Sequence, residues 1–118
     1  MNETEKTRAF IQNYFDSISA GRLEDIPIAD CCSYTGSMLA ETIQGADAVR
    51  EHIAQIAPFI DRIEVKRMVV EGTNGAVIAH LLGFGNRQVK GVVFFVVENG
   101  CLMALDNLFD SRQLLGAL

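Results

Sequence analysis

Several kinds of residue are scarce in this chain of 118 residues, and each shortage excludes a class of protein. There are three cysteines, an odd number, and the adjacent Cys31 and Cys32 cannot easily bridge to each other, so a disulfide framework is not expected. Reduced thiols are typical of the cytosol, which predicts a cytoplasmic protein. No apolar run approaches the roughly 18 residues of a membrane span, and the acidic N-terminus is unlike a secretion signal. We expect no membrane partner.

Basic residues and histidines are also few. The net charge is −5 and no basic block is present, which argues against nucleic acid as a partner. The two histidines lack the spaced carboxylates or cysteines of a metal site. The chain also has no phosphate-binding glycine loop and no nucleophile elbow. We therefore expect neither a metal nor another cofactor.

The most informative stretch runs from Gln88 to Phe109, where two apolar runs flank Glu98-Asn99-Gly100. Both residues of the Asn-Gly pair tolerate the positive φ of a tight turn, which predicts a β-hairpin. Val92 to Val97 has no polar residue on either alternate set, so both faces of this strand should be covered. We expect helices on one face and, on the other, a second layer or a partner subunit, most simply a homodimer.

Helical spacing and capping residues predict two main helices. Asn2 and Glu5 fit an N-cap box for a helix that ends at Ala20-Gly21, and Ala46 to Ala57 forms another that Pro58 stops. Between and after these helices we expect a short helix over residues 23–28, a short strand over 33–38 and a loop over 39–45. Two long strands, over 62–71 and 76–84, then precede the hairpin.

This order predicts a single α+β domain over residues 1–118. A curved, mostly antiparallel sheet would wrap around the N-terminal helix as a cone, in the manner of a cystatin-like α+β roll. The open mouth of such a cone is a natural place for a small ligand.

Short motifs are spread along the whole chain in a characteristic order: Ile11-Gln12-Asn13-Tyr14, Ala20-Gly21-Arg22-Leu23, Gln44-Gly45-Ala46-Asp47-Ala48-Val49-Arg50, Glu98-Asn99-Gly100 and Leu108-Phe109-Asp110. In element order and motifs the chain resembles the nuclear transport factor 2-like superfamily, which includes ketosteroid isomerases, limonene epoxide hydrolases and SnoaL-like polyketide cyclases. Leu105-Asp106-Asn107-Leu108, followed by residues 112–115, also resembles the C-terminal segment of carotenoid-binding members, but the chain has no Trp. One fold of this kind hosts many functions.

The isomerase resemblance places Tyr14 at the position of the family's oxyanion-binding tyrosine. The position of the catalytic base falls at or near Gly36, between Thr35 and Ser37. The position of the protonated carboxylic acid falls near Val92 or Val93. Neither position holds a carboxylate, so the resemblance does not carry the isomerase mechanism over.

The epoxide hydrolase resemblance fails in a similar way. The Arg and Asp of that family's relay fall at Leu81 and Gly83, and its last-strand Asp falls at Asn107, an amide that cannot act as a base. Its water-positioning residues fall around Tyr34 to Ser37. Tyr34 and Ser37 keep polar groups that could orient a ligand.

These observations favour binding of a small apolar molecule, with Tyr14, Tyr34, Ser37, Leu81 and Asn107 as ligand-binding residues. If the protein is an enzyme, isomerisation, cyclisation or dehydration of a carbonyl compound is expected, with Tyr14 holding an enolate-like oxygen. Its base would come from His80 or Asp106. Strand alternation places Asp106 with Leu102, Ala104 and Leu108, and Asn107 with Met103, Leu105 and Phe109. If the phase of the family holds, as the resemblance implies, His80 and Asp106 both face away from the cavity. A bulge that reversed the phase would instead make them the acid and base pair.

Simpler roles remain open for each candidate. Tyr14 fits a core tyrosine, and His80 and Asp106 fit a structural or dimer-interface role. His52 fits a half-exposed histidine on its helix. A second hypothesis is therefore a dimeric, non-catalytic interaction module whose cavity is filled by its own side chains.

Overall fold

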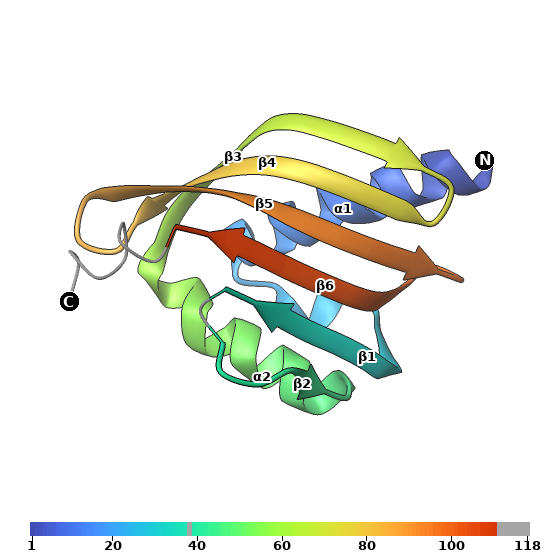
Figure 1. Ribbon diagram of the computed structural model, residues 1–118, viewed down its shortest axis with the longest axis horizontal. Helices are drawn as coiled ribbons and strands as arrows, with labels where there is room; N and C mark the ends of the chain where they lie inside the picture. Colours follow the sequence, from blue (N-terminus) through green and yellow to red (C-terminus); the bar gives the residue numbers. More distant parts are fainter. Residues whose placement is uncertain (38, 111–118) are drawn as a thin grey trace.

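The computed structural model describes residues 1–37 and 39–110, which form two α-helices against one curved six-stranded sheet (Figure 1). The helices are α1 (Glu3–Ala20) and α2 (Ala46–Ile56). The strands are β1 (Ile28–Gly36), β2 (Ile43–Gln44), β3 (Ile60–Glu71), β4 (Asn74–Gly83), β5 (Arg87–Glu98) and β6 (Cys101–Phe109). Two short 3₁₀ turns, Leu23–Asp25 and Ala57–Phe59, follow α1 and α2, respectively. The expected α+β fold class is confirmed.

The sheet order is β2-β1-β6-β5-β4-β3. Every neighbouring pair is antiparallel except β1 and β6, which run parallel and join an early segment of the chain to the last strand. Helix α1 packs on the concave face against β3, β4 and β5, and α2 packs beside β1 and β2 (Figure 1). The two helices and the concave face, called the inner face below, enclose the hydrophobic core.

Helix α1 begins as its capping residues predict. The Oδ1 atom of Asn2 accepts a hydrogen bond of 2.8 Å from the backbone N–H of Glu5, and Gly21 ends the helix with φ +73°. Two hydrogen bonds tie the first turns of α1 to the turn between β3 and β4. The Thr7 hydroxyl donates to the Gly72 carbonyl, and the Gly72 N–H donates to the Thr4 hydroxyl.

The predicted hairpin is confirmed. Asn99 and Gly100, with φ of +52° and +75°, connect β5 to β6, as a primed two-residue turn requires. Alternate residues of β5 then face opposite ways. Phe95 lies in the core, whereas Phe94 is exposed on the convex face, called the outer face below. Among residues 1–37 and 39–110, no helix or strand covers Phe94 on the outer face of this apolar strand.

Three expectations between the two helices are wrong. The helix over 23–28 is only the 3₁₀ turn, because Pro27 has no N–H for a helical bond and its carbonyl instead accepts from Leu102 N–H of β6. Strand β1 starts at Ile28 rather than at residue 33, and the expected loop over 39–45 contains β2. Met38 and residues 112–115 lie outside the described residues.

Strand β6 also contains a bulge that simple alternation missed. Val97 pairs with Leu102 but Val96 pairs with Ala104, so Met103 is an extra residue. Leu102 is consequently fully buried in the core, not on the face of Asp106 as expected. Because the bulge precedes Leu105, the second half of β6 keeps its expected phase.

Candidate functional site

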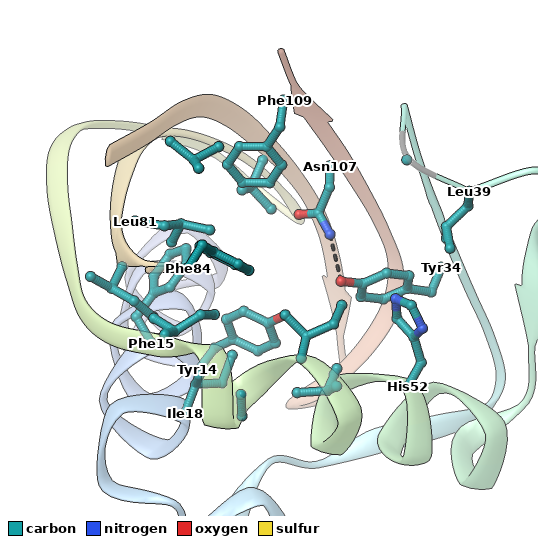
Figure 2. Close-up of a pocket in the computed structure, with 18 residues that line it drawn as sticks. Tyr14, Phe15, Ile18, Tyr34, Leu39, His52, Leu81, Phe84, Asn107 and Phe109 are labelled. Atoms are coloured by element: carbon teal, nitrogen blue, oxygen red, sulfur yellow. Dashed lines mark hydrogen bonds between the residues drawn. The ribbon is translucent and has the colours of Figure 1, made fainter. Parts of the chain in front are cut away.

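A cavity of about 280 Å³ lies between the inner face of the sheet, α1 and α2 (Figure 2). Its wall is mostly aliphatic and aromatic, and it includes four residues with polar side-chain groups: Tyr14, Tyr34, His52 and Asn107. No Asp, Glu, Lys or Arg is among the described residues that line it. The apolar wall is formed by Phe15, Ile18, Gly36, Leu39, Ile53, Ile56, Ala57, Ile60, Ile63, Leu81, Phe84, Val89, Val93 and Phe109.

Tyr14 is held on α1 by edge-to-face packing. Its ring centroid lies 5.2 Å from those of both Phe15 and Phe95. The Tyr14 hydroxyl has no hydrogen-bond partner among residues 1–37 and 39–110. Every fully buried side-chain N or O atom in that part of the chain has a partner, so the Tyr14 hydroxyl is not fully buried. The hydroxyl is therefore open to the cavity. Burial, with Tyr34 and Cys32 nearby, raises the pKa of Tyr14 well above its usual value, so the phenol keeps its proton.

Tyr34 and Asn107 form a hydrogen-bonded pair across the parallel seam between β1 and β6. The register places Tyr34 opposite Leu105 and Gly36 opposite Asn107, so both side chains project from the inner face. The Asn107 amide Nδ2 donates to the Tyr34 hydroxyl oxygen (Figure 2). Burial raises the pKa of Tyr34 to about 12, although the hydrogen bond from Asn107 acts in the opposite direction.

His52 lies on α2 beside this pair, with its ring centroid 5.0 Å from that of Tyr34. Burial lowers its pKa from 6.5, so the imidazole is neutral at pH 7. It is half-buried, as expected, but its contact with the cavity was not predicted. A usable signal was present: His52 follows Val49 by three residues and precedes Ile56 by four, on the face that α2 buries.

The structure brings four of the predicted site residues together: Tyr14, Tyr34, Leu81 and Asn107 all line the cavity. Ser37 does not. Its hydroxyl donates to the Phe109 carbonyl at 2.8 Å and accepts from the Phe109 N–H at 3.0 Å, so it links β1 to β6 at their ends.

Asp106 and His80 lie on the outer face, opposite the cavity. Asp106 pairs with Phe94 and Thr35 in the sheet register, and His80 pairs with Glu64 and Lys90. The Nε2 atom of Gln88 donates to His80 Nδ1 at 3.1 Å. The bulge in β6 does not reverse this placement, so neither residue is the base of a reaction in this cavity.

Two of the positions where the resemblance expects a carboxylate, Gly36 and Gly83, have little room for one. A Cβ atom at Gly36 would lie 2.8 Å from the Asn107 carbonyl oxygen, and one at Gly83 would lie 2.2 Å from the Phe59 carbonyl oxygen. A side chain at either position requires the backbone to move. At these two positions, strand packing therefore disfavours a carboxylate.

No group of His, Cys, Asp and Glu in residues 1–37 and 39–110 could hold a metal ion. In the same part of the chain, neither helix is long and apolar enough to cross a membrane.

Residues 2–109 match the family described as "Domain of unknown function (DUF8021)". The chain belongs to the DUF8021 family. No curated protein sequence matches it significantly. The family assignment is consistent with the geometry above, because it spans both helices and all six strands.

Many solved structures share this fold. A protein from Kribbella flavida provisionally named a ketosteroid isomerase is 27% identical, with a TM-score of 0.81 over 93% of this chain and 82% of that one. An LEH-like epoxide hydrolase from M. tuberculosis is 13% identical, with a TM-score of 0.82 over 98% and 91%. A protein from Jannaschia sp. provisionally named a SnoaL-like polyketide cyclase is 17% identical, with a TM-score of 0.81 over 99% and 94%. With further matches described as NTF2-like, they confirm the resemblance to the nuclear transport factor 2-like superfamily.

Proposed function

We propose that the DUF8021 cavity binds a small, uncharged and largely apolar molecule that presents an oxygen atom to Tyr14. The observation that carries this proposal is the Tyr14 hydroxyl, a protonated donor without a described partner at the wall of an apolar cavity. A polar group in such a place is costly unless a ligand or water satisfies it. The cavity is close to the lower end of the roughly 300–1,000 Å³ of ligand pockets, so the ligand is small.

The electrostatics support an uncharged ligand. Both tyrosines have raised pKa values and His52 has a lowered one, so each of these groups is neutral at pH 7. Asn107, the fourth polar residue of the wall, is an amide. A charged ligand would lose its hydration without gaining an ion pair.

The test uses ligand-observed NMR to compare propiophenone with propylbenzene, which has the same carbon skeleton without the carbonyl oxygen. Tyr14→Phe removes one hydroxyl and should weaken propiophenone binding about five- to tenfold, as loss of a hydrogen bond of about 1 kcal/mol implies. Propylbenzene should bind both proteins equally. Asp106→Asn, on the outer face next to Asn107, is the matched control and should change neither affinity. Equal affinity of propiophenone for the wild type and Tyr14→Phe would refute the proposal.

A reaction in this cavity that transfers a proton has a candidate base in His52, the neutral imidazole of its wall. Such chemistry fits the isomerase, cyclase and dehydratase activities considered from the sequence, with Tyr14 holding the oxygen. The test is exchange of deuterium from D₂O into the carbon next to the propiophenone carbonyl. Wild type should accelerate the exchange and His52→Gln should not; exchange at the buffer rate with wild type rejects turnover of this kind.

The outer face supports a homodimer in solution. Ile78, Val92 and Leu108 follow one another across three strands, with Phe94 beside them, and these apolar side chains are exposed or half-buried in the single chain. We expect dimers by sedimentation equilibrium at micromolar concentration and monomers for Phe94→Glu. A monomeric wild type contradicts this proposal.

The open cavity does not fit the alternative of a module whose cavity is filled by its own side chains.

A cytoplasmic location is also a proposal. It rests on Cys31, Cys32 and Cys101, all of which are free thiols. Fractionation of cells that express a tagged chain tests it, and recovery outside the cytoplasm would contradict it.

A further inference from the structure

The Tyr34–Asn107 pair leaves two hydrogen-bonding functions unused. Because Asn107 Nδ2 donates to the Tyr34 oxygen, the other end of the amide, Oδ1, is turned toward the cavity, as Figure 2 shows. The hydroxyl proton of Tyr34 is likewise not needed for this bond. Among residues 1–37 and 39–110, no donor meets Asn107 Oδ1 and no acceptor meets the Tyr34 proton.

The pair therefore presents an acceptor and a donor side by side. A ligand hydroxyl satisfies both, since it donates its proton to Asn107 Oδ1 and accepts the Tyr34 proton on its oxygen. A carbonyl or ether oxygen satisfies only Tyr34 and leaves the amide oxygen unpaired. A site built to bond a hydroxyl rejects the analogue that lacks it, because its own polar groups then stay unpaired.

Tyr14 adds a second donor close to this pair. Its hydroxyl and that of Tyr34 point toward each other across the cavity in Figure 2, and their proximity contributes to the raised pKa of Tyr14. They are not hydrogen-bonded to each other. The polar groups thus gather in one part of the cavity, while Leu81, Phe84 and Phe109 line an apolar part.

We propose that Tyr34 and Asn107 form a subsite for a ligand hydroxyl, so that the cavity takes hydroxyketones whose hydroxyl lies one or two carbons from the carbonyl that Tyr14 binds. The inference rests on the proposed function, because Tyr14 supplies the carbonyl contact. It goes further by fixing the ligand class: a small uncharged molecule with two neighbouring oxygens at one end and an apolar body at the other.

The experiment uses matched aromatic ketones and measures dissociation constants by NMR or calorimetry. Phenacyl alcohol and β-hydroxypropiophenone carry the hydroxyl at the two spacings, and acetophenone and propiophenone are their parents without it. Wild type should bind one of the two hydroxyketones about tenfold more tightly than its parent. The methyl ether of the preferred hydroxyketone should lose this advantage, since it cannot donate to Asn107 Oδ1.

The variants separate the two parts of the site. Asn107→Leu, which keeps the approximate size of the side chain, should abolish the preference for the hydroxyketone and leave binding of the parent ketone within about twofold. Tyr34→Phe should do the same, because the amide also loses the bond that fixes it; it serves as the second variant if Asn107→Leu does not fold. Tyr14→Phe should weaken the hydroxyketone and its parent equally. Asp106→Asn is again the control.

Each result decides between the proposals. If wild type binds parents and hydroxyketones equally, or if the preference survives both Asn107→Leu and Tyr34→Phe, the subsite is rejected and the pair only links β1 to β6. Ketone binding that depends on Tyr14 but shows no preference for the hydroxyl rejects this inference and leaves the proposed function intact. Failure of all four ketones to bind rejects both.

Discussion

Consecutive residues on the two central strands have opposite surroundings. On β5, Phe95 is 1% exposed and packs against Tyr14 and Phe15, whereas Phe94 is 46% exposed on the outer face. On β6, Asn107 lines the cavity and Asp106 lies opposite it. On β6 the alternation separates chemistry as well as burial, because the neutral amide of Asn107 points inward and the carboxyl group of Asp106 points outward. A residue's type therefore says little about function here until its face is known.

The largest expected effect comes from truncating the two neighbouring phenylalanines. Phe95→Ala removes a fully buried ring and should lower the free energy of unfolding by about 3–5 kcal/mol. Phe94→Ala should lower it by less than about 1 kcal/mol in the monomer, because its ring is half in solvent. Urea denaturation of both variants at a concentration where the protein is monomeric measures the difference. Similar losses would mean that the two faces are equally packed.

A smaller effect is expected from placing a carboxyl group on each face. Val93→Asp puts the group against the cavity, at one of the two positions near which the isomerase resemblance expects an acid. Burial should raise its pKa by roughly two units, which is about 2.7 kcal/mol against the charged form. Val92→Asp, one residue away on the outer face, should cost less than about 1 kcal/mol at pH 7.

The pH dependence of the same pair sharpens the comparison. An acid whose pKa is higher in the folded state is least destabilising when protonated, so Val93→Asp should regain stability relative to wild type as the pH falls below its raised pKa and lose it as the pH rises. Val92→Asp should show little such dependence. Unfolding free energies at a series of pH values measure this, and parallel curves for the two variants would contradict it.

The smallest effect concerns His52. Its folded pKa lies below the unfolded value of 6.5, so the neutral form is favoured on folding. Its contribution to stability is present above pH 6.5 and is lost as the pH falls through the folded pKa. An NMR titration of the imidazole should give a midpoint below 6.5. The His80→Gln variant leaves His52 as the single histidine and so removes any ambiguity of assignment; a midpoint at or above 6.5 would show that burial does not control the group.

Local signals were enough to predict most of the fold. The Asn2 cap, Gly21 and the Asn99-Gly100 turn act within a few residues, and the structure confirms each of them. Tyr14 and Asn107 were placed correctly because α1 and the second half of β6 keep a regular period.

The rest depends on contacts between distant segments. The parallel pairing of β1 with β6 and the extra residue Met103 follow from how strands meet, which no local pattern encodes. The sequence predicts Ser37 as a ligand-binding residue, whereas its hydroxyl is hydrogen-bonded to the backbone of Phe109. Helical spacing places His52 on the buried face of α2, but its contact with the cavity also depends on the packing of α2 beside β1.

The parallel seam between β1 and β6 has a consequence for how the protein forms. Tyr34 and Asn107 are 73 positions apart, and each strand from β4 to β6 can pair with its predecessor through a short turn before β1 is needed. Closing the long loop between β1 and β6 is entropically costly and slow relative to hairpin formation. During synthesis, the N-terminal segment leaves the ribosome long before its partner strand exists. Ligand binding should therefore appear last in refolding, at the moment when β1 pairs with β6.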